Sequence, residues 1–355
     1  VYEQLTASAE DPTVLVLLHT RAAQIREEYL NDVPSAIAHH QKVLAVDAAN
    51  LEAATALERL YQASERYEDL AKTFLTKATL LPEPEGQREY LFRAGALYEE
   101  LLERPESAIE VYERVLSIDA EDAGALDKLI QLHLRLRQWE KLLAVYGRKA
   151  DVVADPEEKK HLYLEVGTVY ERELRQPEKA IETYQRVLDL DPDDMAALSQ
   201  LDALYQSTDR SEDLLAVLER EAELSSDPMR ALDFRYRIGE LHEQKLNDAF
   251  RAVEVYRDIL DVTPDHVAAL TALERMIQKQ QEPVMAASVL EPVYRASADS
   301  VRLANVLEVW IGHEEDPLRK VELLHQVAEI YEVHVEDAQR AFAAYARAFP
   351  IDPQN

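Results

Sequence analysis

The sequence predicts an all-α protein, a solenoid of about twenty helices arranged in hairpins, and three observations lead to this fold class. Only 7 of the 355 residues are glycine, which is few for a protein built of sheets and turns. Apolar residues recur at spacings of three and four, which is the period of a helix. Residues of several types also recur every 72 positions, and stacked repeats of this kind share one continuous core.

The 72-residue stride is visible in several residue types at once. Gly95, Gly167 and Gly239 follow it, each inside a phrase of similar character. The same stride relates four prolines, four leucines and four alanines: Pro12, Pro84, Pro156 and Pro228; Leu57, Leu129, Leu201 and Leu273; Ala36, Ala108, Ala180 and Ala252. Agreement between residue types that serve different purposes indicates a structural repeat.

Each repeat unit is predicted to contain four helices, and residues 156–227 illustrate them in order. Asp155 and Pro156 begin the first helix, because Asp caps a helix and Pro suits its first turn; we expect it to reach about residue 175. Pro177 begins the second helix, and Asp191-Pro192 begins the third. The fourth is expected near residues 210–225. Apolar faces support the last three: Ala180, Ile181, Tyr184, Val187 and Leu188; Ala197, Leu198, Leu201 and Tyr205; Leu214, Leu215 and Leu218.

The chain is predicted to be one array, with units at about 12–83, 84–155, 156–227 and 228–316 and a partial unit at 317–355. The register breaks once, because Pro228, Ala252 and Tyr256 recur 89 positions later instead of 72. The surplus residues predict an additional helix near 299–313. Val1 and Tyr2 align with the middle of a fourth helix, and residues 351–353 precede a third, so we expect a fragment of a longer protein. The cytoplasm is the favoured location.

Charge excludes some classes of partner. The chain has 69 acidic and 39 basic residues, a formal net charge of −30. A surface this acidic repels phosphate backbones and anionic lipid, so nucleic acid and membrane are poor partners. The apolar run at residues 14–18 is far too short to cross a membrane, and the absence of cysteine excludes disulfides and thiolate metal sites.

The repeat resembles the tetratricopeptide repeat, in which a small residue and an aromatic residue on one helix face an alanine and an aromatic residue on the next. The matching residues are Gly167, Tyr170, Ala180, Tyr184 and Pro192 in one unit, and Gly95, Tyr98, Ala108 and Tyr112 in the unit before it. The intervening hairpins depart from the pattern, since Glu58, Ile130, Asp202 and Glu274 stand where the small residue belongs. The resemblance implies a right-handed superhelix that binds protein or peptide partners on its concave face, with no chemistry and no cofactor of its own.

A series of glutamates is the most pointed candidate for a binding site. The series, called the glutamate ladder below, consists of Glu27, Glu99, Glu171, Glu243 and Glu332. By the resemblance these residues lie on the inner surface, where they would attract a basic ligand; the alternative is that each forms an ion pair with a neighbouring repeat. Further candidates for the concave face are Phe92, His161, Leu164, Tyr236 and Glu240.

Catalytic and metal sites find no support in the sequence. There is no cysteine nucleophile, no Gly-x-Ser-x-Gly elbow, no glycine-rich phosphate loop and no HExxH pattern. The acidic segment at residues 189–194 lacks the central Gly and distant Glu of a calcium loop, so we interpret its aspartates as helix caps. His39 and His40 are interpreted as a surface pair.

Three functions are consistent with these features. The leading one is a non-catalytic scaffold that binds a partner protein or peptide, and the net charge favours a basic partner. A second is a spacer or self-assembling element of a large bacterial machine. A third is the regulatory domain of a larger enzyme or transcription factor. The sequence leaves the oligomeric state open.

Overall fold

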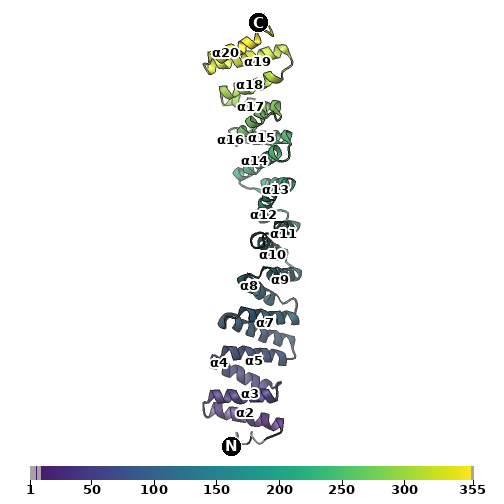
Figure 1. Cartoon of the computed structure of the whole chain (residues 1–355), viewed down its shortest axis with the longest axis vertical. Helices are drawn as coiled ribbons and strands as arrows, with labels where there is room; N and C mark the ends of the chain where they lie inside the picture. Colours follow the sequence, from purple (N-terminus) through teal and green to yellow (C-terminus); the bar gives the residue numbers. More distant parts are fainter. Residues whose placement is uncertain (1–4, 6–8, 353–355) are drawn as a thin grey trace. The chain divides into compact units, whose positions relative to one another are not determined.

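The structure, a computed structural model, describes residue 5 and residues 9–352, and the regular elements within them are all helical. The helices form two compact units, one ending at Leu174 and the other beginning at Arg175. Figure 1 labels the helices of both units in chain order. The predicted all-α class is therefore correct. The predicted helix through Val1 and Tyr2 and the predicted boundary at Pro353 lie outside the described residues.

In unit 1 each helix packs against the next in chain order. Two short π-helical turns, η1 and η2, extend α6 and α10. The elements are α2 (Pro12–Glu28), α3 (Val33–Val46), α4 (Leu51–Ala63), α5 (Tyr67–Leu80), α6 (Pro84–Ala96), η1 (Leu97–Leu101), α7 (Pro105–Ile118), α8 (Ala123–Arg135), α9 (Trp139–Val152), α10 (Pro156–Thr168) and η2 (Val169–Glu173).

Unit 2 follows the same rule of consecutive packing. Its elements are α11 (Pro177–Leu190), α12 (Met195–Ser207), α13 (Ser211–Leu224), α14 (Pro228–Gln244), α15 (Ala249–Val262), α16 (Val267–Gln278), α17 (Pro283–Ala296), α18 (Ser300–His313), α19 (Pro317–Glu329), η3 (Ile330–His334) and α20 (Ala338–Ala348). Helix α18 occupies the range in which the sequence predicts an additional helix.

Side-chain caps determine where many helices begin. Asp155 accepts a hydrogen bond from the Glu157 amide, as predicted for the start of α10. The predicted start of α12 at Asp191-Pro192 is wrong by a few residues. Helix α11 continues to Leu190 and residues 191–194 form a turn, because Asp194 is the residue whose carboxylate caps the Ala197 amide at 2.9 Å.

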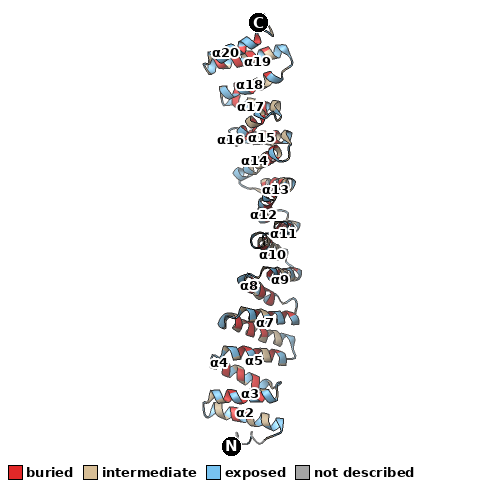
Figure 2. Ribbon diagram, viewed as in Figure 1, coloured by how far each residue is buried: buried red, intermediate tan, exposed pale blue. Residues whose placement is uncertain are grey.

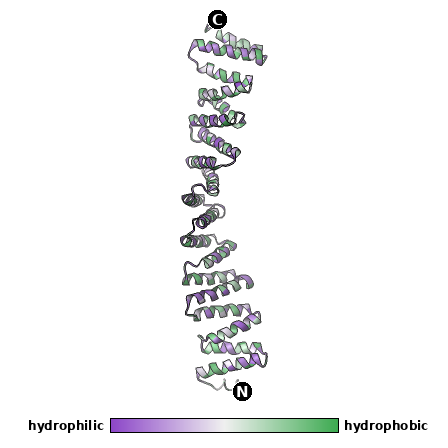
Figure 3. Cartoon of the chain, turned by 180° about the vertical axis from the view of Figure 1, so that it is seen from behind, coloured by the Kyte–Doolittle hydropathy of each residue, from purple (hydrophilic) through white to green (hydrophobic). Residues whose placement is uncertain are grey.

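Glycine–tyrosine contacts hold the hairpins together. A Cβ atom on Gly95 would lie 2.6 Å from the Tyr112 ring, and one on Gly239 would lie within 2.9 Å of the Tyr256 ring. Both rings are fully buried, so the two helices approach each other through the missing side chain. Buried faces point at neighbouring helices, and apolar and polar residues alternate around single helices (Figures 2 and 3).

Candidate functional site

The first two members of the glutamate ladder are paired within unit 1. Arg59 of α4 donates from both terminal nitrogens to the two carboxylate oxygens of Glu27 on α2, with an Nη2–Oε2 distance of 2.8 Å. This hydrogen-bonded ion pair holds the pKa of the Glu27 carboxyl below its ordinary value. Glu99 of η1 accepts from Lys128 of α8 at 3.1 Å. Each carboxylate is thus neutralised by a cationic side chain on the first helix of the next hairpin.

Glu243 is the most deeply buried member of the ladder, with a side-chain exposure of 0%. Arg275 of α16 donates to both its oxygens, at 2.6 and 3.0 Å, and the Lys279 ammonium lies 3.3 Å away. Burial alone would raise the pKa of the Glu243 carboxyl, but the two cations outweigh burial and lower it. A carboxylate enclosed in this way has no face left for a ligand.

The remaining ladder members differ in their surroundings. Glu332 of η3 is exposed and accepts a hydrogen bond from the Tyr345 hydroxyl at 3.2 Å. Glu171 of η2 is half-buried and also has an interaction partner. Glu27, Glu99 and Glu243 therefore fit the ion-pair alternative, and a ligand-binding role for the ladder stays a prediction.

Replacing Glu243 with glutamine separates the structural role from a surface role. Glu243→Gln is expected to destabilise the protein by about 1–2 kcal/mol, because a charge-assisted network loses its anion. Glu332→Gln, the control at the exposed position, is expected to change stability by less than about 0.5 kcal/mol. Urea denaturation of both variants measures the difference, and equal stabilities would contradict a structural role for Glu243.

The predicted aromatic candidates pack against the buried tyrosines. The Phe92 ring lies 5.6 Å from the Tyr112 ring, and the Tyr236 ring lies 5.8 Å from the Tyr256 ring. The Tyr236 hydroxyl also donates to Glu240 at 3.1 Å. These residues cover the glycine–tyrosine contacts, so their aromatic character has a structural reason.

The other two predicted candidates lie on α10. His161 is exposed and its Nε2 atom lies 3.9 Å from Glu165, while Leu164 is half-buried. The corresponding residue of α19 is His325, whose ring lies 5.7 Å from the Tyr345 ring. His325 is not among the predicted candidates, because the series of Phe92, Leu164 and Tyr236 was not extended past the register break.

A second series of carboxylates stands where the repeat pattern expects a small residue. Glu58 accepts from Lys77 and from Arg93, both at 2.6 Å. Asp202 accepts from both terminal nitrogens of Arg237, at 2.6 and 2.7 Å. Glu274 accepts from the Tyr294 hydroxyl at 2.7 Å. Three of the four intervening hairpins thus have a polar contact where the pattern has a close helix contact, and the fourth has Ile130.

Glu221 of α13 is a carboxylate without a matching cation of its own. It is 2% exposed, and its Oε2 atom is buried without a hydrogen-bond partner in the described part of the chain. Asp202 and Arg237, already bonded to each other, flank it. Burial, reinforced by the Asp202 charge, raises the pKa of the Glu221 carboxyl to about 7.

Four other carboxylates remain accessible in unit 2, on helices α14 and α19. Asp233 is exposed and Glu240 half-buried on α14, and Glu322 and Glu329 are exposed on α19. Within each helix the two residues are seven apart, so they share one face. We call these pairs the acidic stripes. Among residues 9–352 no Lys, Arg or His side chain forms an ion pair with any of the four.

Three hollows accompany these helices in unit 2. One of about 320 Å³ lies among α12, α13 and α14 and includes Glu240 in its wall. A second, of about 230 Å³, includes Trp310 and Glu322. The third, of about 540 Å³, lies among α16, α17 and α18. One residue of each acidic stripe, Glu240 or Glu322, therefore borders a hollow.

The interpretation of His39 and His40 as a surface pair is wrong. They are 7% and 5% exposed, because α3 packs against both α2 and α4. The Nδ1 atom of His39 lies 3.0 Å from the Nδ1 atom of His19. The described residues contain no cluster of three or more groups able to hold a metal ion, and none of their helices is long and apolar enough to span a membrane.

Comparison with known proteins finds one family whose sequence profile matches two segments of the chain. A sequence profile of the tetratricopeptide repeat matches residues 89–122 and 161–194, which cover most of α6 with α7 and most of α10 with α11. No curated protein sequence matches the chain.

Several solved structures are similar to the chain. YrrB, described as a tetratricopeptide-repeat protein with an unusual peptide-binding site, is 21% identical, with a TM-score of 0.32 over 52% of this chain and 90% of its own. Naa15/Naa10 bound to HypK-THB is 15% identical, with a TM-score of 0.39 over 95% of this chain and 53% of its own. PilF of Pseudomonas aeruginosa is 14% identical, with a TM-score of 0.30 over 73% and 96%.

Proposed function

We propose that the chain, two segments of which match the profile of the tetratricopeptide repeat, is a non-catalytic scaffold. It binds a basic segment of a partner protein through the acidic stripes of α14 and α19. Repeats of this family are generally interaction modules that bind proteins or peptides. The stripes supply what a basic segment requires, which is accessible negative charge beside a hollowed surface.

The state of the other carboxylates supports the stripes as the binding groups. Three of the five ladder members, Glu27, Glu99 and Glu243, have their charge neutralised by Arg59, Lys128 and Arg275. Asp233, Glu240, Glu322 and Glu329 form no such ion pair with any residue that the structure describes, and Glu240 and Glu322 lie in the walls of hollows. Accessible charge at a hollow is the observation that carries the proposal. The net charge of −30 adds a long-range field that steers a basic ligand toward the protein.

Neutralising the stripes is the direct test. The variant Asp233→Asn, Glu240→Gln, Glu322→Gln, Glu329→Gln is expected to bind a lysine-rich peptide about 30-fold more weakly, at about 0.5 kcal/mol for each exposed contact. Fluorescence anisotropy with a labelled peptide measures the affinity. Binding to the unaltered protein is expected to weaken as salt rises, because exposed charges are screened.

A matched control removes the same number of negative charges from helices α11 and α15, which carry no acidic stripe. Glu182 and Asp189 of α11 and Asp258 and Asp261 of α15 are exposed, so their four amide substitutions change the net charge equally. This control is expected to lose only a few-fold in affinity through the weaker field. Equal losses of affinity in the two variants would show that only the net charge matters and that the stripes are not the binding site. Binding that does not depend on salt would refute the proposal.

A further inference from the structure

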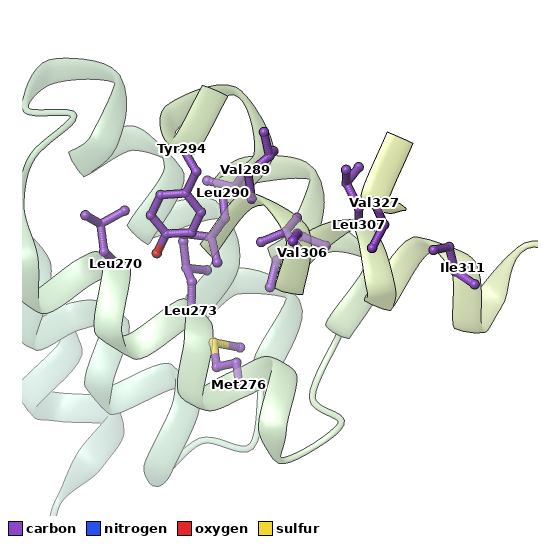
Figure 4. Packing of buried hydrophobic residues seen from close by; sticks show 14 of the residues in the cluster. Leu270, Leu273, Met276, Val289, Leu290, Tyr294, Val306, Leu307, Ile311 and Val327 are labelled. Atoms are coloured by element: carbon purple, nitrogen blue, oxygen red, sulfur yellow. The ribbon is translucent and has the colours of Figure 1, made fainter. Parts of the chain in front are cut away.

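The hollow of about 540 Å³ combines an apolar floor with polar walls. Figure 4 shows two of its apolar residues, Leu290 and Val306, within the buried hydrophobic cluster. Leu290 of α17 and Val306 of α18 form its floor and are 0% and 3% exposed. Ile277 of α16 and Val301 of α18 flank the opening, and Val301 is 44% exposed. An apolar side chain seated here would remove Val301 and Ile277 from water, which favours binding.

The charges in this pocket are already paired. Glu274 accepts from the Tyr294 hydroxyl at 2.7 Å and lies 3.4 Å from Nε of Arg302. Since one anion and one cation neutralise each other at the rim, the pocket offers no net charge to a ligand. Its occupant is therefore expected to be an uncharged group.

Two amide side chains from different helices line the pocket. Gln278 extends from α16 and Asn305 from α18, and both are exposed. Neither amide is hydrogen-bonded to another residue in the described part of the chain. An amide both donates and accepts, which is what the backbone of an extended peptide requires on each of its edges.

We propose that this pocket binds an extended peptide segment by seating one branched aliphatic side chain over Leu290 and Val306. The Gln278 and Asn305 amides bond to the peptide backbone on either side of that residue. The volume of about 540 Å³ accommodates the side chain together with adjoining backbone.

The inference rests on the proposed function and narrows the partner. In chain order α16 to α18 lie between α14 and α19, which carry the acidic stripes. A segment that engages both features has an aliphatic residue with lysine or arginine on each side. The pocket thus selects an aliphatic residue in the partner segment, whereas the stripes select its positive charges.

A neutral peptide tests the pocket without involving the stripes. A capped pentapeptide with a central leucine and no charged residue is titrated into the protein while methyl signals of Leu290, Val301 and Val306 are followed by NMR. Shifts confined to these methyl groups, with an affinity about tenfold higher than that of the same peptide with a central serine, are expected. Unchanged methyl signals would overturn the inference, even if basic peptides bind.

Rim variants provide the matched comparison. Val301→Glu is expected to abolish the preference for leucine, whereas Val267→Glu, the same change at a position of α16 that is 74% exposed, is expected to preserve it. The double variant Gln278→Ala, Asn305→Ala is expected to weaken both peptides about tenfold and leave their ratio unchanged. Retention of the leucine preference in Val301→Glu would also overturn the inference.

The two proposals fail in distinguishable ways. If the leucine peptide shifts the methyl signals but lysine-rich peptides bind equally to the stripe variant and its control, the pocket stands and the basic-partner proposal falls. If lysine-rich peptides depend on the stripes but no leucine preference exists, the pocket inference alone falls.

Discussion

Replacing Glu221 with glutamine is expected to remove the pH dependence that this residue gives to the stability of unit 2 between pH 5 and pH 8. The pKa of the Glu221 carboxyl is about 7 in the folded protein, against 4.5 for an exposed glutamate. Between these values the folded state holds a proton that the unfolded state has lost. This contribution to stability is complete below pH 4.5 and is lost as the pH rises past about 7.

The expected loss is large. At about 1.4 kcal/mol for each pH unit between the two pKa values, ionisation of Glu221 costs about 3 kcal/mol at pH 8. Glutamine resembles the protonated acid and stays neutral, so Glu221→Gln is expected to be more stable than the unaltered protein at pH 8 and similar to it at pH 5. Denaturation curves at both pH values give the comparison.

Glu219→Gln controls for the removal of one negative charge from the same helix. Glu219 is exposed, so its variant is expected to keep the pH dependence of the unaltered protein. The same pH dependence in Glu219→Gln and Glu221→Gln would contradict the assignment of the effect to burial.

Replacing Glu221 with lysine provides a second test. The stride places Lys77 and Lys149 at the equivalent positions, and Lys77 bonds to Glu58 at 2.6 Å. Glu221→Lys is therefore expected to bond to Asp202 in the same way and to raise stability at pH 8 above that of Glu221→Gln. A lower stability than that of the unaltered protein would show that the site does not accept the cation.

Adding one methyl group at Gly239 is expected to destabilise unit 2 by about 2–3 kcal/mol. The new Cβ atom of Gly239→Ala would overlap the Tyr256 ring, which is fully buried. That ring is held on one face by Tyr236, and its hydroxyl donates to Glu243, so it has little room to move. The steric cost outweighs the gain of about 1 kcal/mol that alanine gives over glycine in a helix.

Gly312→Ala is the matched control, since a Cβ atom there meets nothing within 4 Å. It is expected to raise stability by about 0.5–1 kcal/mol through helix propensity alone. The variant Gly239→Ala is also expected to be partly rescued by Tyr256→Leu, which removes the obstructing ring. Thermal unfolding of the unaltered protein, the two glycine variants and the double variant measures these effects. If Gly239→Ala left stability unchanged or raised it, the Tyr256 ring would have room to move away.

The helices and their order were predictable because the relevant forces are local. Apolar spacing, aspartate caps and proline positions act within a few residues, so the start of α10 at Pro156 and of α11 at Pro177 could be read directly. Asp191-Pro192 misled for the same reason, since an aspartate three residues later made the better cap.

The candidate site was predicted less well because partners of a charged group lie far along the chain. Arg59 is 32 residues from Glu27, and several cations lie within similar reach. Sequence reasoning kept ligand binding and ion pairing open for the ladder, and it did not single out Glu221, Asp233 or Glu322. The available signal is spacing, because Glu221 lies seven residues after Leu214 and three after Leu218, on the buried face of α13, whereas Glu219 does not.

The sequence by itself determined the helical class, the hairpin order and the small residues at the helix contacts, because periodicity and steric size are properties of the residues themselves. Only the tertiary structure decided which carboxylates are neutralised, which stay accessible and which are buried without a cation. The physical reason is that desolvation and charge pairing depend on all the helices that surround a group, and those neighbours are assembled only when the hairpins pack.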